Sequence, residues 1–353
     1  MTASPLIQAS LQSILDGDRL ALARLITQVE NGTPQGRLAL SQIFPATGRA
    51  HLIGVTGPPG TGKSSLVNQL ARYYRQPAEG EAPQRVGIVA VDPSSPFTGG
   101  AILGDRVRMR DLAGDPGVFI RSMASRGSLG GLARATAGVV QAIDAAGFEL
   151  ILIETVGAGQ AEVDIASLAH TTLVVEAPGM GDDIQAIKAG ILEIADILVV
   201  NKADRPGAEA TERALRGMLQ LAHPTPHIFR HHGQFERVFP GEGAPAAEIK
   251  PAGDTPLWIP PVLRTVATEG MGVPELAQAI ARHARHLRET GDWQRRERTR
   301  LQSELDSLLQ ESLVNRWRGS VSETSYHQVL QDLMERQISP WQAVSILLDG
   351  GAS

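Results

Sequence analysis

The stretch HLIGVTGPPGTGKS, residues 51–64, joins an apolar run to a glycine-rich loop that fits the pattern GxxxxGK(S/T). The apolar run predicts a buried strand, and residues Lys63 to Tyr74 predict a helix that starts directly after the loop. Glycines let the backbone N–H groups of such a loop surround phosphate, while the lysine reaches the β and γ oxygens and the following hydroxyl can bind Mg²⁺. The stretch therefore predicts a nucleotide-binding loop, and its context argues against an accidental match.

A second short motif, NKAD at residues 201–204, follows the apolar run 195–200. Beside a phosphate-binding loop this pattern selects guanine, because the carboxylate of Asp204 can accept hydrogen bonds from the N1–H and the exocyclic amine of that base together. Adenine offers no such pair. Lys63 and Lys202, one in each motif, are two of only four lysines among 33 basic residues. We therefore expect guanine nucleotide to bind at Asn201, Lys202 and Asp204.

The composition of the 353-residue chain argues against several classes of protein. It has no cysteine, which excludes disulfides and thiolate metal sites, and no apolar run approaches the length of a membrane span. The N-terminus has no basic segment followed by a long apolar stretch, so we expect a cytoplasmic protein. The net charge of −5 argues against a general nucleic-acid binder. The local basic cluster is interpreted as the solvated face of a helix: Arg295, Arg296, Arg298 and Arg300.

Apolar segments alternate with helical ones from residue 51 to residue 267. Near-continuous apolar strands of this kind are typical of an α/β fold with a mostly parallel sheet that helices cover on both faces. The ligand is expected beyond the carboxyl ends of the strands, where both motifs lie. A stretch rich in proline, glycine and histidine, residues 223–260, predicts a surface excursion. The expected strands are 51–56, 86–92, 117–121, 148–154, 171–177, 195–200 and 261–267.

The chain is expected to have three parts: an N-terminal helical extension at 1–48, a nucleotide domain at 49–272 and a C-terminal helical arm at 273–353. The arm has leucines at helical spacing with charges between them. These are Leu301, Leu305, Leu308, Leu309 and Leu313. Such a stripe must be buried, so the arm predicts a homodimer interface. The alternative is that the arm packs back on its own nucleotide domain.

Three longer segments between and beside the two motifs share one resemblance. They are VDPSSPFTGGAILGDRVRM at 91–109, ETVGAGQAE at 154–162 and GDDIQAIKAGI at 181–191. In order and spacing, residues 50–204 resemble the MeaB/ArgK family of P-loop GTPases, the chaperones of adenosylcobalamin-dependent methylmalonyl-CoA mutase. The helical flanks resemble the N-terminal extension and the C-terminal dimerisation arm of that family.

The resemblance implies a phosphate loop and a Mg²⁺ site. The loop would be formed by Gly57, Pro58, Pro59, Gly60, Thr61, Gly62, Lys63, Ser64 and Ser65. The metal ligands would be Ser64, Asp92, Asp105 and Glu154. Physical reasoning agrees for Ser64, Asp92 and Glu154. Ser64 belongs to the phosphate-loop pattern, Asp92 and Glu154 each end an apolar strand, and oxygen ligands suit a hard cation. The place of Asp105 depends more on the resemblance, and the alternative for Asp92 is a turn cap before Pro93.

The segment that starts at Glu154 occupies the place where many GTPases have DxxG. The resemblance implies that the backbone N–H of Gly157 donates to the γ-phosphate and that the following loop responds to hydrolysis. Gln160 is a candidate for orienting the attacking water, although it lies farther from Gly157 than the glutamine of small signalling GTPases does. Lys63, Glu154 and Gln160 are therefore the expected catalytic residues.

A third set of guanine contacts is expected at Val266, Ala267 and Thr268. Relatives usually have a Ser-Ala pair here, and Val266 departs from that pattern. The backbone N–H of Ala267 is still expected to reach O6 of the base. This contact depends more on the resemblance than the contact of Asp204 does.

The resemblance implies a Mg²⁺-dependent GTP hydrolase that binds GTP and GDP. It would gate cofactor delivery to methylmalonyl-CoA mutase, or to a close relative, and protect that mutase. Two alternatives stay open. One is a kinase acting on a transport protein, and the other is a metal-delivery GTPase of the nickel-chaperone type. The absence of cysteine and of a histidine-rich tract argues against the latter.

Overall fold

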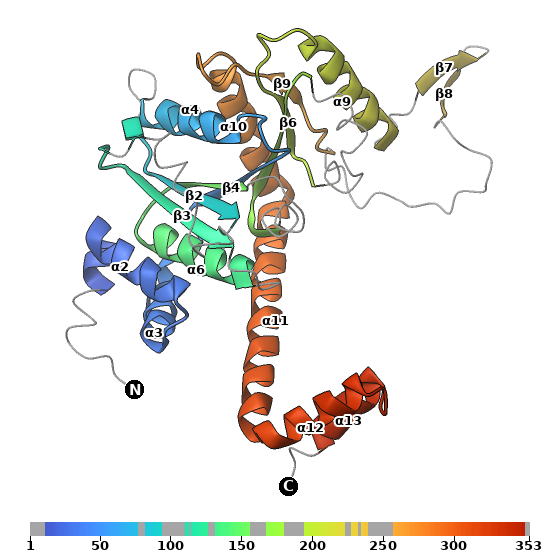
Figure 1. Cartoon of the computed structure of the whole chain (residues 1–353). Coiled ribbons are helices and arrows are strands. Elements are labelled where there is room, and N and C mark those ends of the chain that lie inside the picture. Colours follow the sequence, from blue (N-terminus) through green and yellow to red (C-terminus); the bar gives the residue numbers. More distant parts are fainter. Residues whose placement is uncertain are drawn as a thin grey trace. The chain divides into compact units, whose positions relative to one another are not determined.

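The fold of the chain is seen in a computed structural model, which describes residues 11–76, 82–93, 110–112, 114–125, 131–155, 167–179, 194–222, 227–231, 234–238 and 257–349. Its centre is a seven-stranded sheet in the order β3-β2-β4-β1-β5-β6-β9 (Figure 1). Every pairing in this sheet is parallel, which confirms the predicted sheet. The strands are β1 (His51–Thr56), β2 (Val86–Pro93), β3 (Val118–Ser125), β4 (Leu150–Thr155), β5 (Thr171–Glu176), β6 (Ile197–Val200) and β9 (Val262–Arg264).

Helices cover both faces of the sheet, as the near-continuous apolar strands predict. On one face, α4 (Lys63–Arg75) and α10 (Val273–Thr290) share a core with Ile53 and Val55 of β1. On the other, α2 (Arg19–Glu30), α3 (Pro34–Ile43) and α6 (Gly131–Ala145) pack together (Figure 1). Helix α9 (Ala208–Ala222) packs on β6 and β9.

The N-terminal helices are part of the hydrophobic core. Asp18 caps α2 by accepting hydrogen bonds from the backbone N–H groups of Leu20 and Ala21 at 2.8 and 3.0 Å. Helices α2 and α3 lie close enough that a Cβ on Gly36 would meet the carbonyl oxygen of Gln28 at 2.8 Å. Five apolar residues from this region are buried in the same core as α6: Ile14, Leu22, Leu25, Ile26 and Ile43.

Shorter elements complete the description. The 3-10 helices η1 (Phe44–Ala46) and η2 (Arg110–Leu112) connect larger elements. Within the stretch predicted as a surface excursion, β7 (His227–His231) and β8 (Gln234–Val238) form an antiparallel pair. Within the described part of the chain, no helix combines the length and the apolar character needed to cross a membrane.

The C-terminal helices divide between two compact units, residues 1–298 and 299–353. Helix α10 belongs to the first, where Leu276 and Ile280 share a core with Leu66 of α4. Helix α11 (Asp292–Ser320) crosses the division, and α12 (Glu323–Met334) and α13 (Pro340–Asp349) complete the second unit. The predicted boundary at 272/273 separates α10 from the strands on which it packs, and the three-part organisation stays a prediction.

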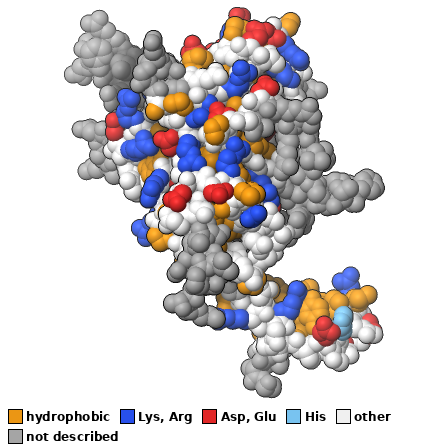
Figure 2. Space-filling model, turned by 90° about the vertical axis from the view of Figure 1, so that its left-hand side faces the viewer, with side chains coloured by type: hydrophobic (Ala, Val, Ile, Leu, Met, Phe, Trp, Pro, Cys, Tyr) orange, Lys and Arg blue, Asp and Glu red, His pale blue; other side chains and the backbone are white. Residues whose placement is uncertain are grey.

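The second unit exposes much apolar surface. In the predicted stripe, Leu305 is 56% exposed and Leu313 is 63% exposed. Further along, Trp341 is 83% exposed, and Figure 2 shows hydrophobic side chains gathered over this C-terminal segment. Within the unit, Nε1 of Trp317 donates to the carbonyl oxygen of Leu347 at 2.9 Å and ties α11 to α13.

A polar cluster lies at the amino ends of β1, β5 and β6, opposite the end where the motifs lie. We define it as His51, His170, Thr171, Asp196, His283 and Arg296. The carboxylate of Asp196 accepts two bonds of 2.7 Å from Arg296 and one of 2.8 Å from the backbone of Thr172. Burial raises the pKa of Asp196, but hydrogen bonds from His283 and Arg296 outweigh it and hold that pKa below its ordinary value. The predicted solvated face is therefore wrong for Arg296, and also for Arg300, which is buried.

The hydroxyl of Thr171 connects two rings of the cluster. Its oxygen lies 2.8 Å from Nε2 of His51 and 2.9 Å from Nδ1 of His283. The other nitrogen of His283, Nε2, lies 3.3 Å from Oδ1 of Asp196. Because a carboxylate only accepts, a neutral His283 holds its hydrogen on Nε2 and accepts at Nδ1 from the hydroxyl. The hydroxyl oxygen then accepts from Nε2–H of His51, so one set of tautomers satisfies every contact.

The first two turns of α11, residues 292–298, are fixed to this end of the sheet. The Trp293 ring stacks on His170 with the ring centres 3.9 Å apart. Nε2 of His170 lies 3.2 Å from a carboxylate oxygen of Glu297, and Arg296 donates to the carbonyl oxygen of His170 at 2.9 Å. The start of α11 is thus an integral part of the first unit.

The buried His51 makes stability depend on pH. Burial lowers its pKa well below the ordinary value, and the neighbouring His170 and His283 lower it further. Below about pH 6.5 the unfolded chain therefore binds a proton at His51 that the folded chain excludes, and stability is lost as pH falls. We expect this site to cost about 1.4 kcal/mol of unfolding free energy between about pH 7.5 and 5.5.

The measurement is urea denaturation of the wild type and of His51→Gln at both pH values. Glutamine keeps an N–H donor for Thr171 but does not titrate. The variant should lose less stability on acidification than the wild type, by the amount given above. Equal pH dependence of the two proteins would contradict the assignment.

Candidate functional site

The glycine-rich loop joins β1 to α4 in a conformation that requires its glycines. Gly57 has a φ of 133°, and a Cβ there would lie 2.1 Å from the carbonyl oxygen of Val175. Gly62 has a φ of 92°, and its Cβ would meet Nδ2 of Asn201 at 2.5 Å. Any larger residue would move the loop away from β5 or from the second motif, so the glycines fix the loop on the sheet.

Lys63 starts α4 and turns back over the loop. Its side chain is buried, and Nζ donates to the carbonyl oxygens of Gly57 at 2.7 Å and Pro58 at 2.9 Å. Thr61 also closes on Pro58, donating to its carbonyl oxygen at 3.0 Å. The ammonium group therefore lies against the loop, where the pattern predicts the phosphates.

Two of the predicted metal ligands meet at the carboxyl edge of the sheet, on the face that α4 covers. The hydroxyl of Ser64 donates to Oε1 of Glu154 at 2.6 Å, although 90 residues separate them. Glu154 is the penultimate residue of the buried strand β4 and is 5% exposed. A hydroxyl and a carboxylate at this distance form an all-oxygen donor set that fits a hard divalent cation.

The other predicted residues of this part of the site are Asp92, Asp105, Gly157 and Gln160. Asp92 lies near the end of β2. The residue before it, Val91, pairs with Thr155 of β4, so the backbone of Asp92 is at the same edge of the sheet as Glu154. Asp105, Gly157 and Gln160 lie outside the described residues, and their roles stay predictions.

The NKAD motif is joined to the phosphate loop by both of its first two side chains. Nδ2 of Asn201 donates to the carbonyl oxygen of Thr61 at 2.8 Å. Nζ of Lys202 donates to the carbonyl oxygen of Gly60 at 2.5 Å, and Lys202 itself has a left-handed φ of 57°. The structure thus places the two motifs side by side, with Asp204 exposed at the end of the second.

The third predicted guanine segment is held by Asn201. Its Oδ1 accepts from the hydroxyl of Thr265 and from the backbone N–H of Ala267, both at 3.1 Å. The backbone N–H of Val266 donates to the carbonyl oxygen of Met271 at 3.0 Å. The Ala267 amide that was expected to reach O6 is therefore directed at Asn201 in this structure, and the base contact stays a prediction.

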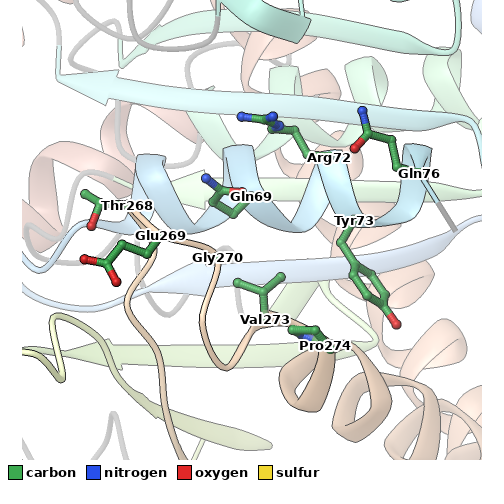
Figure 3. Close-up of a pocket in the computed structure, with 9 residues that line it drawn as sticks. All are labelled: Gln69, Arg72, Tyr73, Gln76, Thr268, Glu269, Gly270, Val273 and Pro274. Carbon is green, nitrogen blue, oxygen red and sulfur yellow. The ribbon is translucent and has the colours of Figure 1, made fainter. Parts of the chain in front are cut away.

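A pocket of about 380 Å³ lies beside this segment, between α4 and the start of α10 (Figure 3). It shares only Thr268 with the predicted nucleotide residues and includes neither Lys63 nor Ser64. It is therefore a neighbour of the third guanine segment and not the phosphate site. Its lining consists of Gln69, Arg72, Tyr73, Gln76, Thr268, Glu269, Gly270, Val273 and Pro274.

One acidic residue of this edge was missed by sequence reasoning. Glu176 ends β5 and is buried, and its carbonyl oxygen accepts from the backbone N–H of Asn201 at 2.8 Å. Its sequence signal is the same as for Glu154, an acidic residue that ends an apolar strand. The two strands lie on either side of β1.

The family described as methylmalonyl-CoA mutase-associated GTPase MeaB matches residues 22–322 of the chain. The chain belongs to the MeaB family. This membership confirms the predicted family, the guanine-nucleotide specificity at the level of the family and the predicted enzyme class, a GTP hydrolase.

Relatives extend over most of the chain. A Pyrococcus horikoshii protein is 41% identical over 343 residues, covering 97% of this chain and 98% of that protein. GTPase ArgK of Escherichia coli is 35% identical, covering 77% of this chain and 74% of ArgK. The mitochondrial methylmalonic aciduria type A homolog of Caenorhabditis elegans is 33% identical, covering 64% of this chain and 60% of that protein.

A solved structure described as LAO/AO transport system kinase has the same fold. It superposes with a TM-score of 0.67 at 24% identity, and the match covers both chains completely. At this identity the likeness concerns the fold alone. It confirms the predicted P-loop fold with its helical C-terminal region.

Proposed function

We propose that this MeaB-family GTPase is a cytoplasmic, Mg²⁺-dependent chaperone of an adenosylcobalamin-dependent methylmalonyl-CoA mutase, or of a close relative. The proposal that the chain binds a guanine nucleotide rests on the hydrogen bonds made by Asn201. This side chain binds the phosphate loop at Thr61 and the third guanine segment at Ala267. The family description supports the mutase as partner.

In the proposed mechanism of GTP hydrolysis, some residues stabilise charge and others position the γ-phosphate and the attacking water. The ammonium of Lys63 is held at the loop and would stabilise the negative charge that develops on the β and γ oxygens. Ser64 and Glu154 would hold Mg²⁺, which supplies further positive charge to the phosphates when it is bound. Gly157 and Gln160 are proposed to contact the γ-phosphate and the attacking water. Water would then attack the γ-phosphorus in line, and the bond between this phosphorus and the β,γ-bridging oxygen would break. GDP is the leaving group, and inorganic phosphate is the second product.

The proposal is tested with purified protein and labelled GTP. We expect free inorganic phosphate as the product, no comparable reaction with ATP, and loss of turnover when divalent cations are chelated with EDTA. Label transferred to a protein would instead favour the kinase alternative. For the chaperone role, the protein and the mutase of the same organism should elute together in gel filtration, and the mutase should raise the rate of GTP hydrolysis. Failure of both would refute the proposed partner.

We also propose a homodimer that forms through the second unit. The support is the apolar surface exposed by Leu313, Trp341 and their neighbours, because exposed apolar side chains that gather in one place mark an interaction site. Removal of residues 299–353 should give a monomer that still binds GDP. The cut is placed after Arg298 because Trp293 and Arg296 bind the sheet of the first unit.

Light scattering measures the outcome. A matched control keeps the full chain and carries Leu309→Asp and Leu313→Asp, which place charges on the stripe. Both proteins should have the mass of one chain, whereas the wild type should have the mass of two. A dimer that survives both changes would show that the interface lies elsewhere.

A further inference from the structure

Two buried threonines are hydrogen-bonded to each other where β1 and β4 end. The hydroxyl of Thr155 donates to the hydroxyl of Thr56 at 3.1 Å, and each residue is 1% exposed. Thr56 directly precedes Gly57, the first residue of the phosphate loop. Thr155 directly follows Glu154, which accepts the bond from Ser64. The pair therefore lies next to both halves of the site without belonging to either.

The threonine pair and Glu154 lie on opposite faces of the sheet. Along β4, Leu152 belongs to the core beneath α4, whereas Ile153 belongs to the core beneath α6. Because side chains alternate along a strand, Glu154 projects to the α4 face, where Ser64 lies, and Thr155 projects to the α6 face. A change at Thr155 can therefore reach the site through the backbone of β4 or through Thr56, but not by direct contact with Ser64.

The backbone ladder between the two strands ends just before this pair. The last paired residues of β1 and β4 are Val55 and Glu154. One residue further, the contact between these strands is the bond between the two hydroxyls. On its other side, β4 stays paired with β2 up to Thr155, which pairs with Val91. Loss of the hydroxyl bond therefore loosens the end of β4 on the side of the phosphate loop, where no other described contact ties it to β1 beyond Glu154.

We propose that Thr155 is a positioning residue for GTP hydrolysis. Its bond to Thr56 holds the end of β4 against the start of the phosphate loop, so that Glu154 stays aimed at Ser64. This inference rests on the proposed GTPase function. Misplacement of a reacting group by about 1 Å can cost a hundredfold in rate, so a modest loosening is sufficient for a large effect.

The test compares full-length wild type with Thr155→Val, Thr155→Ser, Thr56→Val and the double valine variant. Valine keeps the branched shape and removes the hydroxyl, whereas serine keeps the hydroxyl. Thr136→Val is the matched control, because Thr136 is also fully buried but lies on α6 and bonds to the sulfur of Met123. Three quantities are measured: kcat for GTP, Kd for GDP and the thermal midpoint.

Thr155→Val should lower kcat about tenfold or more and leave the Kd for GDP within about twofold. Thr155→Ser should stay within about threefold of wild type, and the double variant should be no slower than the slower single variant. Thr136→Val should keep the wild-type kcat.

A purely structural role predicts a different result. Thr155→Val would then lower the thermal midpoint while kcat per folded molecule stays at the wild-type value, and this outcome overturns the proposal. Equal losses in Thr155→Val and Thr155→Ser also overturn it. Should Thr155→Val not fold, Thr56→Val decides by the same criteria. A wild type without GTP turnover would instead refute the proposed function itself.

Discussion

Lys63→Met is expected to lower kcat/KM for GTP by about a thousandfold, the largest effect predicted for any single change in this chain. Methionine matches the lysine side chain as far as Cε but lacks the ammonium that bonds to the carbonyl oxygens of Gly57 and Pro58. The same charge is expected to stabilise the transferring phosphoryl group, so the loss appears in the chemical step as well as in binding. The measurement is the rate of phosphate release over a range of GTP concentrations.

The control for this variant removes a charge of the same sign nearby. Arg205 is exposed and lies directly after the NKAD motif, and Arg205→Met should change kcat/KM by less than about twofold. A Lys63→Met protein that turns over GTP within about tenfold of wild type would show that the phosphate loop has been assigned wrongly.

Asp204→Asn is expected to reduce GTP affinity about tenfold or more and to weaken the preference for GTP over ATP. The carboxylate is expected to accept from two donors of guanine. The amide replaces one acceptor with a donor, so a donor faces a donor. Competition between GTP and ATP for the bound state measures the change.

Xanthine nucleotide provides a matched control for this variant. Xanthine has a carbonyl where guanine has its exocyclic amine, so the amide of the variant can donate to it. Asp204→Asn should therefore bind xanthosine triphosphate more tightly than wild type does. Unchanged discrimination between GTP and ATP would reject the role of Asp204, whatever the result with xanthine.

The parts of the site that the sequence predicted are those in which a short motif fixes its own conformation. Gly57, Gly62 and Lys63 act within a few residues of each other, so pattern and geometry coincide. The contact of Ser64 with Glu154 was also predictable, because parallel strands bring their carboxyl ends to one edge.

Contacts that depend on the packing of distant elements were not predictable. The bond between Thr56 and Thr155 joins residues 99 apart, and no pattern distinguishes these threonines from others. Nothing in the sequence distinguishes Arg296 from its exposed neighbour Arg295. In the structure Arg296 pairs with Asp196 at the amino end of β6, whereas Arg295 pairs with Asp292 of its own helix. Helix α10 has a strong amphipathic pattern, which predicts that one face is buried. The pattern does not predict that this face packs against α4.

The hydroxyl of Thr171 has one hydrogen to donate, so it couples the tautomers of two rings that stand on different elements. It donates toward Nδ1 of His283 on α10, and its oxygen accepts from Nε2–H of His51 on β1. The carboxylate of Asp196 sets this order, because it can only accept from Nε2 of His283. A single acidic side chain at the amino end of β6 thus determines which nitrogen carries the hydrogen in a ring that it does not contact through a hydrogen bond.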